Sequence, residues 1–288
     1  MNVHILFIKS FYKLLSIILA TILFGVLDSF WRPLILDNGH LKVLLHRTIL
    51  TVLIFILFKI AISEPFVWNY HMIFLTVLSG IIATVGLYSL TKAFQLINTS
   101  TVVFLNIFTL LFGQLFSFIF FGETLEVDLY SIELILSIFT ILLLNQGSFK
   151  LRKGIIFGLV ASFCFGLAYP LMGIPIKVLG SFNSSFIQEI VVLMGVTLMS
   201  AINKETSLDF SFFKSPLLIL LSLFTVVALI LHFNSYESYP VFKINMISNF
   251  YPVVALISSV LLYKEEISLI QFFGALLAMI TTIVIITF

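Results

Sequence analysis

The chain alternates between long apolar runs and short polar connections. Ten runs come close to the roughly 20 residues that a helix needs to cross a bilayer. They are approximately Tyr12–Trp31, Leu41–Ile60, Met72–Leu90, Val102–Phe121, Leu129–Asn145, Gly154–Ile174, Phe186–Ile202, Pro216–His232, Ile244–Tyr263 and Ser268–Thr287. Charged residues and prolines gather in the connections. The pattern predicts an all-α integral membrane protein with about ten transmembrane helices.

Composition excludes the main alternatives to this class. The 288 residues are 61% hydrophobic and 10% charged, whereas a soluble protein carries roughly 25% charged residues. Strands of a membrane barrel are about ten residues long with alternating polarity, and these runs are longer and apolar throughout. The net charge of +2 gives no support to nucleic-acid binding. Cys164 is the one cysteine, so no internal disulfide can form.

A shift by 141–142 residues, with at most one residue of gap, aligns the chain with itself. Ala20–Gly25 then falls on Ala161–Gly166, Arg47 on Glu189, and Glu123 on Glu265. We therefore predict two five-helix units, residues 12–147 and 154–288. Because five is odd, the second unit enters the membrane from the opposite side, which gives an inverted repeat of the kind that suits alternating access.

These features carry a resemblance to a known family. Small residues in the first helix of each unit, the arginine in the second helix, the segment after the third helix, and a proline and terminal glutamate of the fourth helix all resemble EamA-type members of the drug/metabolite transporter superfamily. In this chain they are Ala20–Gly25, Ala161–Gly166, Arg47, Ala93–Asn98, Pro252 and Glu265. Two departures stand out: Leu110 takes the place of the proline in the first unit, and Glu189 takes the place of the arginine in the second.

The resemblance implies a secondary transporter rather than an enzyme. We expect it to export a small polar metabolite, such as an amino acid, by alternating access, with no cofactor, metal or catalytic residue. Its partners would be the solute and the lipid bilayer, and proton coupling is a hypothesis based on Asp28, Glu189, His232 and Glu237. Two alternatives remain open: an intramembrane enzyme acting on lipid or peptide, and a non-transporting scaffold without a central cavity.

Ionisable residues inside the apolar runs are the first candidates for the solute site, since a charge at mid-bilayer costs about 2.5–3.5 kcal/mol on insertion scales. Arg47 and Glu189 would line the cavity and contact a charged solute or each other, or else extend toward the headgroups. Asp28 shares a helix face with Trp31. It is a candidate proton carrier, a partner for Arg47, or an acid at a helix end.

A second group of candidates lies in the polar stretch from His232 to Asn249. Asn245 and Asn249 are four residues apart and share a face that leads to Tyr251 and the proline after it, where a bent helix would free a carbonyl. Asn106 and Tyr169 would line the cavity from other helices. For the asparagines the alternative is hydrogen bonding between helices. The stripe Gly154, Gly158, Ser162 and Gly166 predicts close helix packing.

The expected location is the cell (plasma or inner) membrane, but orientation is in conflict. The family resemblance implies cytoplasmic termini. The terminal side carries Lys9, Lys13, Lys59, Lys177 and Lys243, whereas the other side carries Arg32, Lys42, Lys92, Lys150, Arg152, Lys153, Lys204, Lys214 and Lys264. The positive-inside rule would place the second, larger set in the cytoplasm. We expect the family orientation.

Overall fold

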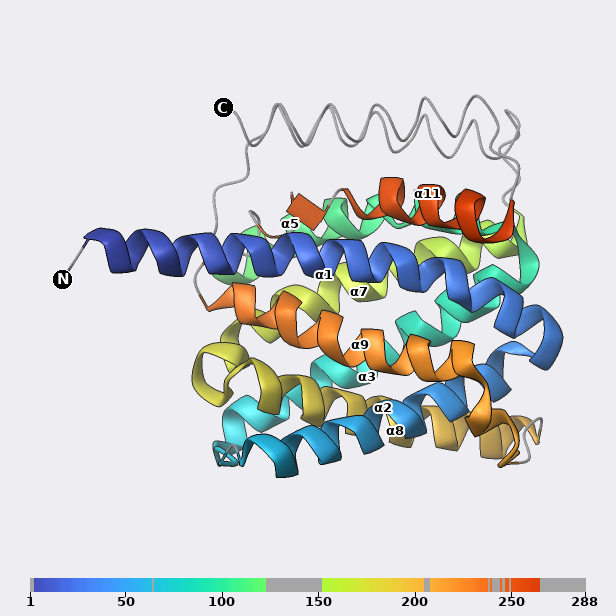
Figure 1. Cartoon of the computed structure of the whole chain (residues 1–288), viewed down its shortest axis with the longest axis horizontal. Coiled ribbons are helices and arrows are strands. Elements are labelled where there is room, and N and C mark those ends of the chain that lie inside the picture. The colour runs from blue at the N-terminus through green and yellow to red at the C-terminus, as the bar shows by residue number, and fades with distance from the viewer. Residues whose placement is uncertain are drawn as a thin grey trace.

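The long helices of the chain lie side by side in one bundle (Figure 1). The computed structural model describes residues 3–63, 65–122, 152–204, 208–237, 239, 244, 247–248 and 250–264, with side chains from residue 12 onward. Its elements are α1 (Val3–Asn38), α2 (His40–Ile62), α3 (Tyr70–Leu96), α4 (Thr99–Leu105), α5 (Ile107–Phe121), α7 (Lys153–Leu179), α8 (Ser181–Asn203), the short 3-10 helix η1 (Phe212–Lys214), α9 (Pro216–Tyr236) and α11 (Tyr251–Tyr263). No strand occurs among these described residues.

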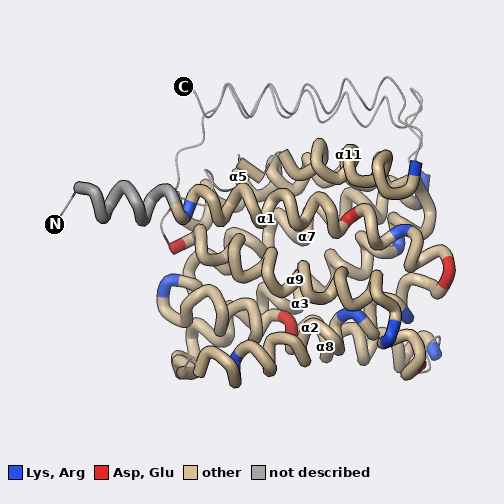
Figure 2. Tube along the Cα trace, in the orientation of Figure 1, with Lys and Arg blue, Asp and Glu red and all other residues tan. Residues whose placement is uncertain are grey.

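Seven segments of the described chain are long and apolar enough to cross a membrane. They are Tyr12–Asn38, His40–Ile62, Tyr70–Leu96, Thr99–Phe121, Lys153–Leu179, Ser181–Asn203 and Pro216–Tyr236. Lys and Arg gather toward the two ends of the bundle (Figure 2). The helical membrane class is therefore confirmed. The predicted runs Leu129–Asn145 and Ser268–Thr287 lie outside the described residues, so the count of ten helices stays a prediction.

Two helices that contain prolines extend beyond their predicted ends, Trp31 and Ile174. The sequence predicted an end before Pro33, but α1 continues to Asn38. In the same way α7 continues past Pro170 and Pro175 to Leu179. A proline removes one helical hydrogen bond, but within a membrane bundle the neighbouring helices and local adjustments make up for this loss. Proline was therefore a weaker stop signal here than in a soluble protein.

The predicted single run Val102–Phe121 is divided in the structure. Its two parts, α4 and α5, meet at Asn106, whose N–H bonds to the carbonyls of Val102 and Val103 at 3.3 and 3.1 Å. Ser162 of α7 donates its hydroxyl to the carbonyl of Leu105 beside this break, at 2.8 Å. In the second half, Ile244, Ile247 and Ser248 are helical, and Phe250 lies in a turn before α11 begins at Tyr251. Both discontinuities lie inside their predicted spans.

Helices from the two halves of the chain pack against one another. In the first half α1 packs on α9 and α11, while in the second α7 packs on α3 and α5. Helix α2 contacts both α8 and α9, and α3 contacts α8. Two glycines allow the closest approaches: a Cβ at Gly25 would lie 3.0 Å from the backbone N of Ala255, and one at Gly166 would lie 2.9 Å from the carbonyl O of Thr109. Gly166 thus belongs to a packing stripe, as predicted.

The two ends of the bundle have different polar contacts. At the end that we call the N-terminal end, Lys13 of α1 reaches the side-chain oxygens of Asn234 and Glu237 at 2.6 and 2.9 Å. At the opposite end, which we call the hairpin end, Lys42 of α2 pairs with Asp209 at 2.8 Å. These contacts show that α1 and α9 run antiparallel, and that α2 and α9 begin at the same end.

Candidate functional site

A cavity of about 160 Å³ lies in the middle of the bundle. A cavity of about 150 Å³ can hold a benzene-sized molecule, so this one has room for a single small solute. Helices α1, α2, α3, α5, α7, α8, α9 and α11 all contribute to its lining. Eight of the ten predicted site residues line it: Asp28, Trp31, Arg47, Asn106, Tyr169, Glu189, His232 and Tyr251. The other two, Asn245 and Asn249, lie outside the described residues.

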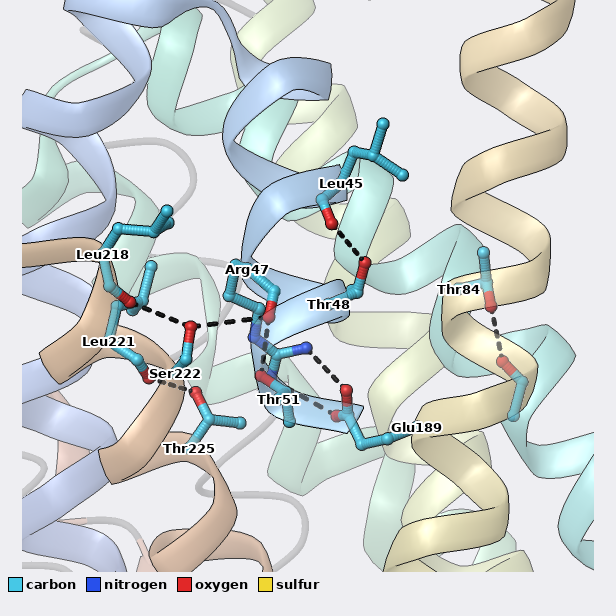
Figure 3. A network of polar contacts seen from close by, with 11 residues as sticks. Leu45, Arg47, Thr48, Thr51, Thr84, Glu189, Leu218, Leu221, Ser222 and Thr225 are labelled. Carbon is cyan, nitrogen blue, oxygen red and sulfur yellow. Dashed lines mark hydrogen bonds and ion pairs between the residues drawn. The ribbon is translucent and has the colours of Figure 1, made fainter. Parts of the chain in front are cut away.

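Arg47 and Glu189 face each other across the boundary between α2 and α8 (Figure 3). The guanidinium donates from Nη1 to Glu189 Oε2 at 2.8 Å and from Nη2 to Oε1 at 3.3 Å. Arg47 is 3% exposed and Glu189 is 5% exposed. Neither side chain extends toward the headgroups, so that predicted alternative is wrong. Since each group neutralises the other, the pair can remain charged in an apolar interior.

Asp28 also lines the cavity, from α1. It is 4% exposed and lies well before the last residue of α1, Asn38, so it is not an acid at a helix end. Its Oδ2 accepts hydrogen bonds from the Tyr251 hydroxyl and from the Asn106 amide. The predicted partnership of Asp28 with Arg47 is therefore not what the structure shows.

Rings cover much of the remaining wall. Phe165 stacks on Tyr169 with centroids 5.6 Å apart, and Tyr169 contacts the ring of His232 at 5.4 Å. Phe24 meets the same histidine edge-on at 5.8 Å. His232 Nε2 lies 3.3 Å from the Tyr236 hydroxyl. The wall is thus largely apolar and aromatic, with its polar groups concentrated at a few points, as in most small-molecule sites.

The sequence prediction missed several residues of the lining. Gln188 donates to Ser79, whose hydroxyl in turn donates to the carbonyl of Ala168. Gln188 is a polar amide next to Glu189 within an apolar run, and this pattern could have marked it as a site residue. Phe24 and Phe165 also line the cavity, and both belong to the repeated segments Ala20–Gly25 and Ala161–Gly166, so the repeat itself pointed to them.

Packed apolar residues lie beyond the cavity toward each end. Toward the N-terminal end they include Ile17, Met172, Ile176 and Phe233. Toward the hairpin end they include Ile35, Leu44, Phe94 and Leu218. Glu237, one of the four residues behind the proton hypothesis, lies at the N-terminal end with Lys13 and does not line the cavity.

The described chain is thus a helical membrane bundle with a central cavity, whose few polar groups come from both halves. Residues 152–287 match the EamA-like transporter family. For this second half of the chain, the match confirms the resemblance seen in the sequence to EamA-type members of the drug/metabolite transporter superfamily. Members of the family are transporters rather than enzymes.

Other comparisons inform the fold alone. A solved structure titled "Crystal structure of protein" is similar over 91% of this chain and 96% of its own, with a TM-score of 0.62 and 16% identity. At that identity it shows a shared fold over nearly the whole chain. No curated protein matches the chain.

Proposed function

We propose that this protein is a secondary transporter that exports a small polar metabolite, such as an amino acid, across the cell (plasma or inner) membrane by alternating access. The observation that carries the proposal is the central cavity, which is lined by helices of both halves and has its polar groups at mid-bundle. A scaffold without transport would not need such a cavity. The eight lining residues predicted from the sequence form the proposed solute site.

The contacts between the halves support two inverted units, residues 12–147 and 154–288. The shift that carries Ala20–Gly25 onto Ala161–Gly166, which we call the repeat shift, relates α1 to α7, α2 to α8, α3 to α9, and α5 to α11. Under this shift the contact of α1 with α9 becomes that of α7 with α3, and the contact of α1 with α11 becomes that of α7 with α5. The contact of α2 with α8 maps onto itself. Exchange of conformations between two such units would open the cavity to alternate sides.

Local geometry supports the same relation. Gly39 joins α1 to α2 with φ 81°, and Gly180 joins α7 to α8 with φ 80°. The repeat shift carries the first glycine onto the second. A positive φ favours glycine, so both units use the same turn at the same place.

A blocked cavity tests the transport proposal. Leu87 lines the cavity from α3, and Val85 lies two residues away with 41% of its surface exposed. Metabolites inside and outside cells would be compared for the natural protein, Leu87→Trp and the control Val85→Trp. We expect one or more metabolites to accumulate outside with the natural protein and with Val85→Trp, but not with Leu87→Trp. Equal export by Leu87→Trp, or no exported metabolite at all, would refute the proposal.

Alternating access has a separate test. The repeat shift carries Ile35 onto Ile176, and each is 1% exposed in the apolar layer of its own end. Single cysteines at these positions, in a Cys164→Ala background, would be labelled with a membrane-impermeant maleimide from each side. We expect conditions that increase labelling of one position to decrease labelling of the other. Labelling that rises and falls together would indicate a channel-like opening.

A further inference from the structure

The charged side chains around the cavity do not balance among the described residues. The lining contains one guanidinium, Arg47, and two carboxylates, Asp28 and Glu189. Glu189 engages both terminal nitrogens of Arg47, so this pair is neutral as a unit. Among the described residues, Asp28 accepts hydrogen bonds from two uncharged donors, the Tyr251 hydroxyl and the Asn106 amide. The remaining charge of the site is therefore the charge of Asp28.

An unpaired carboxylate is costly in such a place. Asp28 is 4% exposed and lies at mid-span. A buried carboxylate without a cation tends to take up a proton, because desolvation penalises its charged form. Either a proton or a cationic ligand can remove this penalty, and both would act at the same oxygens.

We propose that Asp28 binds the protonated amine of the transported solute, and that a proton occupies the same carboxyl group when the solute is absent. This inference rests on the proposed transport function and narrows it to solutes that carry an amine. When the ammonium group binds, Asp28 releases one proton to the open side of the membrane. When the solute leaves on the other side, Asp28 takes up one proton there, so the charge of the site is the same in both forms.

The groups around Asp28 favour an organic cation over a metal ion. The Tyr251 hydroxyl and the Asn106 amide both donate to the carboxylate, whereas a hard metal ion needs several oxygen acceptors. No cluster of metal-ligating side chains occurs in the part of the chain that was described. The rings of Phe24, Trp31 and Tyr169 line the same cavity and suit an ammonium group attached to an apolar body.

A free carboxylate on the solute has no comparable place to bind. Both terminal nitrogens of Arg47 are engaged by Glu189, and its Nε is buried with no hydrogen-bond partner in the described structure. Because Glu189 already neutralises the single positive charge of Arg47, a solute carboxylate there would add a negative charge that no cation balances. We therefore expect an amine to bind more tightly than the corresponding amino acid, and an acid without an amine not to bind.

Five other titratable side chains of the described residues line the cavity and could hold the proton instead. They are Tyr251 on α11, Tyr169 on α7, His232 on α9, and the pair Arg47 and Glu189 on α2 and α8, whereas α3 contributes only apolar residues. Glu189 is already paired with a cation. His232 is packed among rings, and its Nε2 contacts the Tyr236 hydroxyl rather than Asp28. Asp28 is thus the carboxylate at which proton and amine would compete.

Three related probes test the inference on the purified full chain. They are 2-phenylethylamine, phenylalanine and 3-phenylpropionate, which share the ring and differ in amine and carboxylate. Trp31 lines the cavity, and the second tryptophan, Trp68, is 73% exposed. In a Trp68→Phe background, fluorescence would therefore report binding beside Asp28. We expect the amine to bind most tightly, phenylalanine more weakly, and 3-phenylpropionate not at all.

Two further measurements test whether Asp28 itself binds the amine: substitution of Asp28 and the release of protons on binding. Asp28→Asn keeps the size of the side chain, and we expect it to weaken binding of the amine by about 10–100-fold. The control Asp209→Asn removes a distant carboxylate at the hairpin end and should leave binding unchanged. At a pH low enough for Asp28 to be protonated before the amine binds, a pH indicator in weakly buffered solution should record close to one proton released per amine bound, and none for Asp28→Asn. Below the pH at which Asp28 is half protonated, amine affinity should fall about tenfold per pH unit.

Several outcomes would overturn the inference. They are binding of 3-phenylpropionate as tightly as the amine, failure of the amine to bind, unchanged amine binding in Asp28→Asn, or amine binding without proton release. Metabolite export that persists in Asp28→Asn would refute the inference and leave the transporter proposal standing. Loss of the difference between Leu87→Trp and Val85→Trp would refute the transporter proposal itself.

Discussion

The two halves of the chain are alike in packing and unlike in charge. Gly25 and Gly166, which the repeat shift relates, bring α1 onto α11 and α7 onto α5 in the same way. At other related positions the chemistry differs: Asp28 corresponds to Tyr169, and Arg47, once a gap of one residue is allowed, corresponds to Glu189.

This difference teaches how a duplicated bundle can hold one solute site. Close contacts must be present in both halves, because each half needs the same helix spacing. A polar group at mid-bilayer costs free energy in whichever half it lies, so it is retained only where it has a partner or a function. The halves therefore share backbone geometry and divide the polar groups between them. Four substitutions or conditions would break or sharpen this comparison.

The largest effect is expected from separating Arg47 and Glu189. Arg47→Met should destabilise the protein by about 3–5 kcal/mol, because it leaves the Glu189 carboxylate buried without a cation. Thermal unfolding of the purified protein in detergent would measure this loss. The exchanged double variant, Arg47→Glu with Glu189→Arg, should recover most of it, since α2 and α8 face each other at matching positions.

The control for the pair is Arg47→Met with Glu189→Met, which removes both charges. A double-mutant cycle would separate the coupling of the two residues from their individual packing. If Arg47→Met and the double variant are equally unstable, the ion pair does not account for the loss. Failure of the exchanged variant alone would show that the surroundings of the two positions differ.

The second prediction concerns the shared packing. Gly25→Ala and Gly166→Ala should each destabilise the protein by about 1–3 kcal/mol, since the new Cβ would press against the backbone of the neighbouring helix. In an open helix position, replacing glycine by alanine would instead stabilise by about 1 kcal/mol. Thermal unfolding would be compared with Leu19→Ala on the exposed face of α1. A loss at only one of the two glycines would show that the halves do not share this contact.

Much of the fold and many of the lining residues could be predicted from the sequence. Bilayer thickness sets the length of an apolar run, so the seven described spans were found, with ends that differ by up to seven residues. The cost of a buried charge likewise marks Asp28, Arg47 and Glu189 as residues that face protein. Each of these arguments needs only a single residue or a single run, so it can be made from the sequence alone.

The partners of these residues could not be predicted, because they depend on which helices are neighbours. From the sequence, either Asp28 or Glu189 could be the ion-pair partner of Arg47. The contact of α2 with α8 decides for Glu189. The break at Asn106 was missed since no proline marks it. It depends on Ser162, a residue of α7 that is distant in the sequence and bonds to the carbonyl of Leu105.

That contact provides the third prediction. Ser162→Ala should cost about 0.5–1.5 kcal/mol, because it removes the hydroxyl that satisfies a carbonyl on another helix. Thr21 is the position that the repeat shift relates to Ser162, and its hydroxyl bonds to the carbonyl of Ile17 in its own helix. Thr21→Val should therefore change the unfolding temperature less than Ser162→Ala. An equal change would mean that the hydroxyl at the break has no special part in stability.

The smallest expected effect is a dependence of stability on acid pH at the hairpin end. Lys42 and Ser211 donate hydrogen bonds to Asp209, and they hold the pKa of its carboxyl well below the ordinary value of 3.8. Because the folded state binds this proton less readily than the unfolded state, the contribution to stability is fully present above the unfolded pKa. It is lost as the pH falls below about 4 toward the lowered pKa of the folded state.

Asp209→Asn isolates this contribution from other acid-sensitive groups. The variant keeps the backbone N–H that donates to His46 Nε2 at 3.0 Å, so the loop retains its second attachment to α2. We expect the natural protein to be slightly more stable than Asp209→Asn at pH 7, and the difference to shrink between pH 5 and pH 3. The effect should be small, since the pair is partly exposed to solvent. A difference that is constant or grows over this range would show that Lys42 does not act on Asp209 through charge, and that packing alone attaches this loop to the bundle.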